Sequence, residues 1–342
     1  MQRDKGYDFI RFLAMMLILL WHFFTTCTEN SIVVYPLLMS VIDHGGFGFG
    51  GLGVGLFFIL SGALLWHNYG DEEKFSTIVF FKKRIIRICI PLWISFVVSL
   101  LISSISNGGY INYVKENLLG CIISFFGFNF AGDLWNRIGI NTVWITGEWF
   151  TSVILVVYSL FPLLRKLLKA NRGGVYTTIV LGTIFVFNLK YQILSGGGGY
   201  FSFTNGIMYF WLGMIFDKYR NLITKQIEVL AVFACVLIWI LNPATILGFN
   251  YLPVFFASCL SFIILYNIRV DNTVTRYICK YNYEIYLVHH RIFILVMPYW
   301  LNGESRLWQI LLCLGAVFWL TFLIAENLKM ASKNVSDLIC NI

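Results

Sequence analysis

The sequence predicts an all-α protein of the polytopic membrane class: a bundle of about ten transmembrane helices with both termini in the cytoplasm. Of its 342 residues, 58% are hydrophobic and only 12% are charged, whereas a soluble domain carries about 25% charged residues. The apolar residues also occur in blocks of roughly the 20 residues that a helix needs to cross a bilayer. A β-barrel would show short alternating strands instead, and the sequence has none of that pattern.

Ten apolar segments are predicted to span the membrane. Three of them, 51–67, 175–189 and 204–216, are shorter than a full span, so neighbouring residues must extend them or they tilt little. Segment 117–130 is too short to cross, and we expect it to be re-entrant or interfacial. In chain order the predicted spans cover residues 8–27, 51–67, 85–105, 144–164, 175–189, 204–216, 226–242, 246–266, 281–300 and 307–326.

The distribution of lysine and arginine supports this count and sets the orientation. With the N-terminus inside, 20 of the 25 Lys and Arg residues fall on the cytoplasmic side and 4 on the outer side, while Arg291 lies within a predicted span. Cytoplasmic loops of membrane proteins carry this excess of positive charge. One missed or invented span would remove the asymmetry, so both termini are expected in the cytoplasm.

The chain is predicted to be a single integral-membrane domain, 1–342, with no appended soluble domain. The first apolar run has no small-residue cleavage site after it, so we interpret it as a retained helix. The eight cysteines form no CxxC or His/Cys cluster, and no metal site is expected. The net charge of +8 lies in short loops between spans, so orientation explains it better than nucleic-acid binding does.

The first span carries ionisable residues that a lipid-facing helix would not tolerate. Arg11 and His22 are eleven residues apart, which places them on one face of a helix and about 16 Å apart along its axis. Asp8 precedes Arg11 by three residues and can pair with it. Arg11 alone is equally consistent with an end residue that reaches the interface, and His22 alone with a histidine bonded inside the bundle. Their shared face favours a functional interpretation.

The second predicted span is an apolar helix that contains a serine, and the third has a basic cytoplasmic end. Ser61 and Gly62 lie within the second span; they form either a packing notch or a hydroxyl that faces a substrate path. Arg84 and Arg87 share a face at the start of the third span, where they either contact lipid headgroups or form an anion site. Paired guanidinium groups suit a phosphate or pyrophosphate better than lysines do.

Two later spans also carry ionisable side chains. Glu148 lies just inside the fourth span near the outer surface, and it needs a partner from another helix. The ninth span carries Glu284, His289, His290 and Arg291; because successive residues point in different directions, we expect only one or two of them to face inward. Tyr286 is three residues before His289 and shares its face. A bundle of this kind fits either an enzyme with an intramembrane base or a proton-coupled transporter.

Five motifs in order resemble the acyltransferase-3 family of integral membrane acyltransferases, and the resemblance covers nearly the whole chain. The family's D-x-x-R and arginine–ten residues–histidine spacing corresponds to Asp8, Arg11 and His22. Its W-S-L-x-x-E segment is matched less closely, because Ile145-Thr146 replaces Ser-Leu before Glu148. The other three motifs are F-F-x-L-S-G at Phe57–Gly62, R-x-x-R with a following proline at Arg84, Arg87 and Pro91, and I-Y-L-x-H at Ile285–His289.

The resemblance implies a function as well as a fold. Members O-acetylate bacterial surface polysaccharides, so it implies transfer of acetyl from cytoplasmic acetyl-CoA to a sugar hydroxyl of a cell-surface or lipid-linked glycan, by a multi-pass protein of the inner membrane. It implies that His22 is catalytic, either as general base or as acetyl carrier, with Arg11 in the same motif. Glu148 would orient His22 or bind the sugar. The implied donor site is Arg84 and Arg87, and the implied substrate-binding residues are Ser61, Tyr286 and His289.

Two alternatives remain open at this point. A multispan transporter of a glycan or small molecule would also carry buried ionisable residues, although the sequence has no inverted repeat or matched pair of broken helices. A transfer of a different acyl group, such as succinyl, would use the same donor motifs because those address the CoA portion. The sugar, the hydroxyl position and the oligomeric state are not specified by the sequence.

Overall fold

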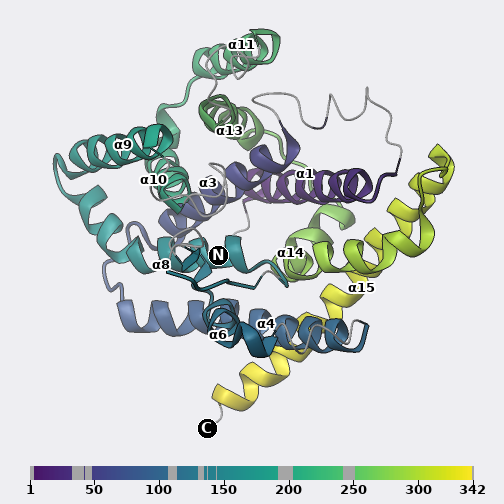
Figure 1. Ribbon diagram of the computed structural model, residues 1–342. Helices are drawn as coiled ribbons and strands as arrows, with labels where there is room; N and C mark the ends of the chain where they lie inside the picture. Colours follow the sequence, from purple (N-terminus) through teal and green to yellow (C-terminus); the bar gives the residue numbers. More distant parts are fainter. Residues whose placement is uncertain are drawn as a thin grey trace.

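Helices make up almost all of the chain that the computed structural model describes, and that part contains no strand (Figure 1). The structure describes residues 4–32, 42, 48–106, 114–129, 135–136, 138–143, 145–191, 203–241 and 251–340. The main helices are α1 (Lys5–Glu29), α3 (Phe49–Tyr69), α4 (Thr77–Ser106), α6 (Leu118–Phe125), α8 (Glu148–Lys169), α9 (Gly173–Tyr191), α10 (Phe203–Tyr219), α11 (Lys225–Leu241), α13 (Tyr251–Tyr266), α14 (Thr273–Trp300) and α15 (Leu307–Cys340); the 3₁₀ helix η4 (Arg220–Leu222) follows α10.

The described part of each of the ten predicted spans lies wholly or largely on a helix, and several helices are longer than the span; residues 144, 242 and 246–250 of the predicted spans lie outside the described residues. Helix α4 begins at Thr77 and α14 at Thr273, and α15 continues to Cys340. Hydropathy marks the apolar portion of a helix, whereas its hydrogen-bonded ends continue through polar residues. Within the described residues, five helices are long and apolar enough to cross a membrane: α1, α3, α4, α8 and α15. The count of ten spans and the cytoplasmic termini remain predictions.

Helix α3 packs in the interior, mainly against α10 and α1, and glycine residues make this packing possible. A Cβ atom added at Gly62 would lie 1.9 Å from the carbonyl oxygen of Phe210, and one added at Gly213 would lie 1.9 Å from that of Ile59. The two glycines therefore form reciprocal notches in which the backbones of α3 and α10 touch. The packing-notch interpretation of Gly62 is correct.

Helices α1, α14 and α15 form the other side of the interior, with α14 packed between its two neighbours. Figure 1 shows α1 crossing the middle of the molecule and α4 below it, beside the last turns of α15. Helix α6 lies against α4 and has 8 residues, a length of about 12 Å that is too short to cross a bilayer. It occupies the segment for which we expected a re-entrant or interfacial element.

A buried carboxylate, Asp217, joins three helices at the end of the bundle where α1 begins. The Tyr7 hydroxyl donates a hydrogen bond to it. Arg220 Nη1 and His67 Nδ1 each lie 3.3 Å from Asp217 Oδ1. Because these side chains belong to α1, α3, α10 and η4, the group fixes the relative positions of those elements.

A second ionic contact ties the start of α1 to the start of α14. Asp271, which precedes α14, lies 2.6 Å from Arg276 Nε and 3.1 Å from Lys5 Nζ. The hydrogen bonds from Arg276 and Lys5 hold the pKa of the Asp271 carboxyl well below its ordinary value. The ionised form of Asp271 therefore favours the contact between the two helices.

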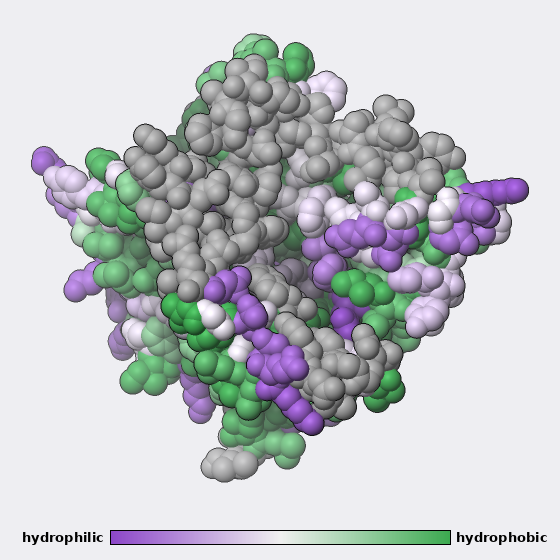
Figure 2. Space-filling model, viewed as in Figure 1, coloured by the Kyte–Doolittle hydropathy of each residue, from purple (hydrophilic) through white to green (hydrophobic). Residues whose placement is uncertain are grey.

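Large apolar side chains cover much of the described outer surface. Figure 2 shows them in green along the margins of the molecule. Helices α9, α11 and α15 are rich in them, with Val229 68% exposed, Phe233 62% exposed and Trp319 67% exposed. Monomeric soluble proteins rarely expose contiguous apolar areas of this kind. The surface is the one that a multi-pass membrane protein presents to lipid.

Candidate functional site

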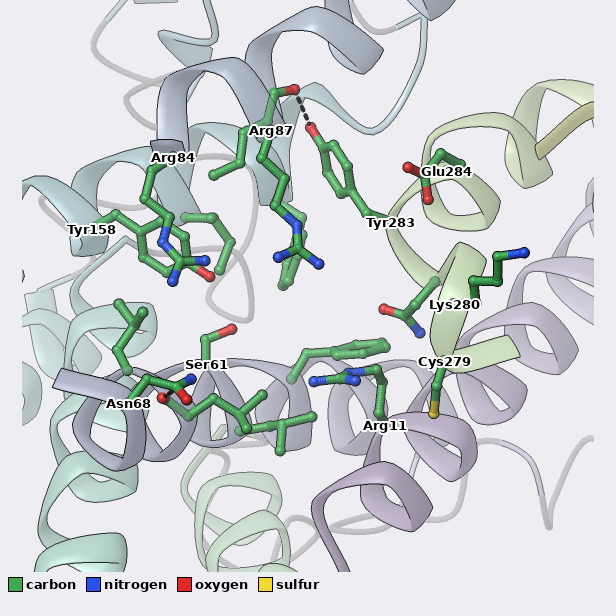
Figure 3. Close-up of a pocket in the computed structure, with 18 of the residues that line it drawn as sticks. Arg11, Ser61, Asn68, Arg84, Arg87, Tyr158, Cys279, Lys280, Tyr283 and Glu284 are labelled. Atoms are coloured by element: carbon green, nitrogen blue, oxygen red, sulfur yellow. Dashed lines mark hydrogen bonds between the residues drawn. The ribbon is translucent and has the colours of Figure 1, made fainter. Parts of the chain in front are cut away.

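A pocket of about 290 Å³ lies between α1, α3, α4, α8, α14 and α15 (Figure 3). One half of its wall is apolar and includes Phe57 and Phe150. The other half carries most of the charge, and five of the six ionisable side chains other than tyrosine and cysteine are cations. The charged lining consists of Arg11, Arg84, Arg87, Lys280, Lys329 and Glu284. A concave site with this excess of positive charge concentrates anions.

Arg84 and Arg87 both line the pocket, as their shared helix face predicts. The guanidinium carbon of Arg84 lies 5.5 Å from the ring centre of Tyr158 on α8 and 5.7 Å from that of Tyr69 on α3. The aromatic faces hold the guanidinium group in place by cation–π attraction, and its Nη2 donates to the Tyr69 hydroxyl at 3.5 Å. Figure 3 shows Arg84 and Arg87 pointing from α4 toward Ser61 and Arg11.

Two donors in the pocket wall have no hydrogen-bond partner. Arg84 Nε and Asn282 Nδ2 are buried, and neither donates a hydrogen bond to any described residue. A buried donor without an acceptor costs about 1–3 kcal/mol. Both groups therefore lie ready to bind the oxygen atoms of a polar or anionic ligand.

Ser61 also lines the pocket, whereas its neighbour Gly62 faces α10. Gly62 therefore forms the packing notch, while the role of the Ser61 hydroxyl on a substrate path remains a prediction. Arg11 lines the pocket from α1, and its Nη1 lies 3.2 Å from Asp8 Oδ1, as the spacing of three residues predicts.

Helices α14 and α15 contribute pocket residues that the sequence did not single out as site residues. Lys329 Nζ lies 3.2 Å from the buried carboxylate of Glu284, and Lys280 lies one helical turn before Glu284. The hydroxyl of Tyr283 donates to the Ile88 carbonyl at 3.0 Å, which fixes α14 against α4. The i, i+4 spacing of Lys280 and Glu284 in the sequence could have indicated that these two residues lie side by side. No pattern in the sequence indicates that Lys329 contacts them.

His22 lies outside the pocket, in a cluster of three imidazole rings. Its ring centre is 4.9 Å from that of His289 and 4.7 Å from that of His290. We expected only one or two of the ionisable residues of the ninth span to point inward, and this number was too low: His289 and His290 both contact His22, and Glu284 lines the pocket. Arg291, which follows His290, donates to the Ser103 hydroxyl on α4. His289 lies sixteen residues after the first residue of α14, about 24 Å into the helix, because α14 begins earlier than the predicted span.

Aromatic side chains connect the pocket to the histidine cluster. The ring of Phe150, which lines the pocket, lies 4.9 Å from that of Tyr286, and the Tyr286 ring lies 5.7 Å from that of His289. Along α1, the pocket residue Arg11 and the cluster residue His22 are about 16 Å apart. The two sites are therefore neighbours joined by an apolar wall.

Glu148 is the first residue of α8, and its backbone lies beside this aromatic wall. A Cβ atom added at the preceding residue, Gly147, would lie 2.1 Å from the Tyr286 ring. The side chain of Glu148 is outside the described atoms, as is the whole of Trp144 in the same motif, so their predicted roles remain predictions.

The described residues contain no group of three or more His, Cys, Asp or Glu side chains placed to hold a metal ion.

Comparison with known protein families gives a match over nearly the whole chain. A family model described as an acyltransferase domain, that of the acyltransferase-3 family, matches residues 4–326. A search of curated proteins and a search of solved structures gave no match. The family match confirms the resemblance drawn from the five motifs.

Proposed function

The chain belongs to the acyltransferase-3 family, and on that premise we propose that it is a membrane O-acetyltransferase. In this proposal it moves acetyl from cytoplasmic acetyl-CoA to a hydroxyl group of a cell-surface or lipid-linked glycan, as a multi-pass protein of the inner membrane. The family and the apolar helices support membrane acyl transfer. The acetyl group, the CoA donor, the glycan acceptor and the location are our proposal.

The observation that carries the proposal is the cation-lined pocket. CoA is a polyanion with a pyrophosphate and a further phosphate, and the pocket offers guanidinium groups at Arg84 and Arg87 together with Lys280 and Lys329. Guanidinium groups bind phosphate oxygens through two parallel hydrogen bonds. The buried Arg84 Nε would then gain the acceptor that it lacks among the described residues.

The apolar wall gives the donor a route to the histidine cluster. Phosphates bound at Arg84 and Arg87 would leave the pantetheine arm of CoA to extend along Phe57 and Phe150. Tyr286 continues this wall to His289 and His22. The thioester would then lie beside His22, the histidine of the arginine–histidine motif on α1.

Two reaction routes at His22 are chemically complete. In the first, a His22 ring nitrogen takes the proton of the acceptor hydroxyl, the hydroxyl oxygen attacks the thioester carbonyl carbon, and the C–S bond breaks. The proton on His22 then passes to the leaving CoA thiolate. In the second, the His22 nitrogen attacks the thioester carbonyl carbon, the C–S bond breaks, and the CoA thiolate takes the N–H proton of the acetylated ring. The acceptor hydroxyl oxygen then attacks the acetyl carbon, the C–N bond breaks, and the hydroxyl proton passes to the imidazole.

The test uses membranes that contain the wild type, His22→Ala or a control, Thr25→Ala. Thr25 lies one turn along α1, and its hydroxyl bonds only to carbonyl groups of its own helix at Trp21 and His22. Acetyl-CoA labelled in the acetyl group is added, and label in the glycan fraction and release of CoA are measured. We expect both signals in the wild type and Thr25→Ala, and neither in His22→Ala.

Full acetylation by His22→Ala would overturn the assignment of His22. CoA release without label in the glycan would point to a different acceptor. Absence of both signals with acetyl-CoA, but their presence with succinyl-CoA, would replace acetyl with succinyl. Movement of glycan across vesicles without any CoA would favour the transporter.

A further inference from the structure

The imidazole ring of His22 lies against two other imidazole rings, and one of these is held in a defined way. His289 is 2% exposed. Its Nδ1 lies 2.7 Å from the backbone carbonyl oxygen of Tyr286, one turn earlier in α14. A carbonyl oxygen only accepts hydrogen bonds, so the hydrogen atom of this contact is on Nδ1. In the neutral ring, Nε2 then carries a lone pair and is an acceptor.

Among the described residues this acceptor has no partner. His289 Nε2 is buried and makes no hydrogen bond with any described residue. Leaving a buried acceptor unpaired is unfavourable, so a nearby N–H or O–H group is expected to pair with it. Nδ1 of His289 therefore has a hydrogen-bond partner, whereas Nε2 has none among the described residues.

The nearest ring with an N–H group is that of His22. Its centre lies 4.9 Å from that of His289, compared with 5.8 Å for Phe293 and 6.3 Å for His290. Phe293 has no hydrogen atom to donate in this way. A ring separation of 4.9 Å allows a nitrogen of His22 to reach His289 Nε2 after a rotation of the His22 ring, which leaves the His289 contact with the Tyr286 carbonyl in place.

We propose that His289 is a positioning residue for His22: its Nε2 accepts a hydrogen bond from one ring nitrogen of His22 and so holds the lone pair on the other. The proposal rests on the acyl transfer proposed above. It differs from the substrate-binding role that the sequence predicted for His289. In many hydrolases a carboxylate orients the catalytic histidine in this way; here a neutral imidazole on α14 would do so.

His290 is the alternative that the geometry must separate from His289. Its ring also contacts His22, at 4.7 Å. Its side chain is half-buried, and the structure gives it no anchoring contact comparable with that between His289 and the Tyr286 carbonyl. An orienting group needs a fixed tautomer of its own, and of the two described imidazoles that contact His22, His289 is the one that is anchored through a backbone carbonyl.

The first experiment reads the tautomers directly. The full chain is labelled with ¹⁵N in its histidine rings and placed in lipid nanodiscs, and its five histidines are assigned by single substitutions. For the wild type we expect His289 protonated on Nδ1 only, His22 as one tautomer, and a ¹⁵N–¹⁵N coupling across a hydrogen bond between them. A mixture of His22 tautomers in the wild type would overturn the proposal.

Three variants separate the possibilities. His289→Phe keeps a ring but removes the acceptor, so His22 should become a mixture of tautomers. His289→Gln places an amide oxygen near the position of Nε2, so it should restore one tautomer, and it serves as the second variant if the Phe variant does not fold. His290→Phe should leave the His22 tautomer unchanged. A change caused by His290→Phe alone would assign the role to His290 instead.

Kinetics provide the second readout. His289→Phe should lower kcat on the order of 100-fold, leave the KM for acetyl-CoA within a factor of about 2, and be partly rescued by His289→Gln. A raised KM for the acceptor with unchanged kcat would instead support the substrate-binding role. The ¹⁵N result does not depend on activity, so failure of the proposed acyl transfer and failure of this positioning role are distinguishable.

Discussion

Ser61 and Gly62 are adjacent in the sequence but face different parts of the molecule. The Ser61 side chain lines the cation-rich pocket, and the Gly62 Cα lies against the backbone of Phe210. One dipeptide therefore combines a pocket surface with a helix contact. Because α3 contacts α10 at Gly62 and lines the pocket at Ser61, a movement of α3 away from α10 would also change the pocket.

This arrangement predicts that a substitution at Gly62 lowers the stability of the fold much more than a substitution at Ser61. In Gly62→Ala the new Cβ would meet the Phe210 carbonyl oxygen at 1.9 Å, so α3 and α10 must separate, at a cost of about 1–3 kcal/mol or more. Ser61→Ala removes one hydroxyl from the pocket wall and should change stability by less than about 0.5 kcal/mol. Thermal unfolding in detergent measures both. Equal midpoints for the two variants would contradict the backbone contact.

Loss of either pocket arginine is expected to weaken donor binding more than turnover. A hydrogen bond to a charged group contributes about 1.5–3 kcal/mol, so Arg84→Ala or Arg87→Ala should raise the KM for acetyl-CoA roughly 10- to 100-fold. Arg84→Lys should recover little, because the ammonium group lacks the planar pair of donors.

Lys82 and Lys83 provide matched controls for the arginine variants. They lie on the same turn of α4, are exposed, and do not line the pocket. Their alanine variants should keep the wild-type KM in steady-state kinetics. A similar rise in KM for all four variants would show that general positive charge, not the pocket, attracts the donor.

The pair of Glu284 and Lys329 is expected to couple α14 to α15. Its atoms are 3.2 Å apart, and the side chains are 8% and 36% exposed, respectively. Lys329→Ala leaves a buried carboxylate without its partner and should destabilise the protein more than Glu284→Ala does, because Lys329 retains access to water.

A double-mutant cycle on the two residues gives the measurement, with an expected coupling free energy of about 0.5–3 kcal/mol. Lys333→Ala, an exposed lysine one turn further along α15, is the control and should have little effect. A coupling free energy near zero would mean that the pair contributes nothing beyond its separate side chains.

The contact of Asp271 with Arg276 and Lys5 predicts a dependence of stability on pH. The pKa of the Asp271 carboxyl is lowered in the folded protein by hydrogen bonds from Arg276 and Lys5. A lowered carboxyl pKa contributes stability above the unfolded value of about 3.9, and this contribution is lost as the pH falls through the folded value.

Asp271→Asn should therefore lower the unfolding temperature at pH 6. Below about pH 4 the difference in unfolding temperature between the wild type and this variant should decrease as the pH falls. The effect is small because the group is exposed to solvent. Asp71→Asn, at an exposed carboxylate between α3 and α4, is the control. A constant difference between wild type and Asp271→Asn at every pH would contradict the assignment.

The sequence predicted the elements of the site better than their mutual contacts. Helical spacing places Arg84 and Arg87 on one face of their helix, and Arg11 on one face with His22. The three arginines line the pocket together with Ser61. Periodicity within one helix determines which residues share a face, and this part could be predicted.

Contacts between helices could not be predicted in the same way. Lys329 and Tyr158 enter the pocket from α15 and α8, and their positions depend on the rotation and depth of those helices. His289 and His290 both contact His22, although successive residues of a helix differ in direction by about 100°. The His22 ring lies between those two directions, which only the packing of α1 on α14 determines.

Because positive charge is concentrated in the pocket, binding of an anionic ligand there affects the stability of the whole helix bundle. Arg11, Arg84 and Arg87 come from α1 and α4, and lysines come from α14 and α15, so their mutual repulsion opposes the association of four helices. A polyanion bound only by the folded chain offsets that repulsion and, at 100 times its dissociation constant, adds about 2.7 kcal/mol to stability. The ligand-free protein is accordingly expected to unfold more easily than the protein with a bound polyanion.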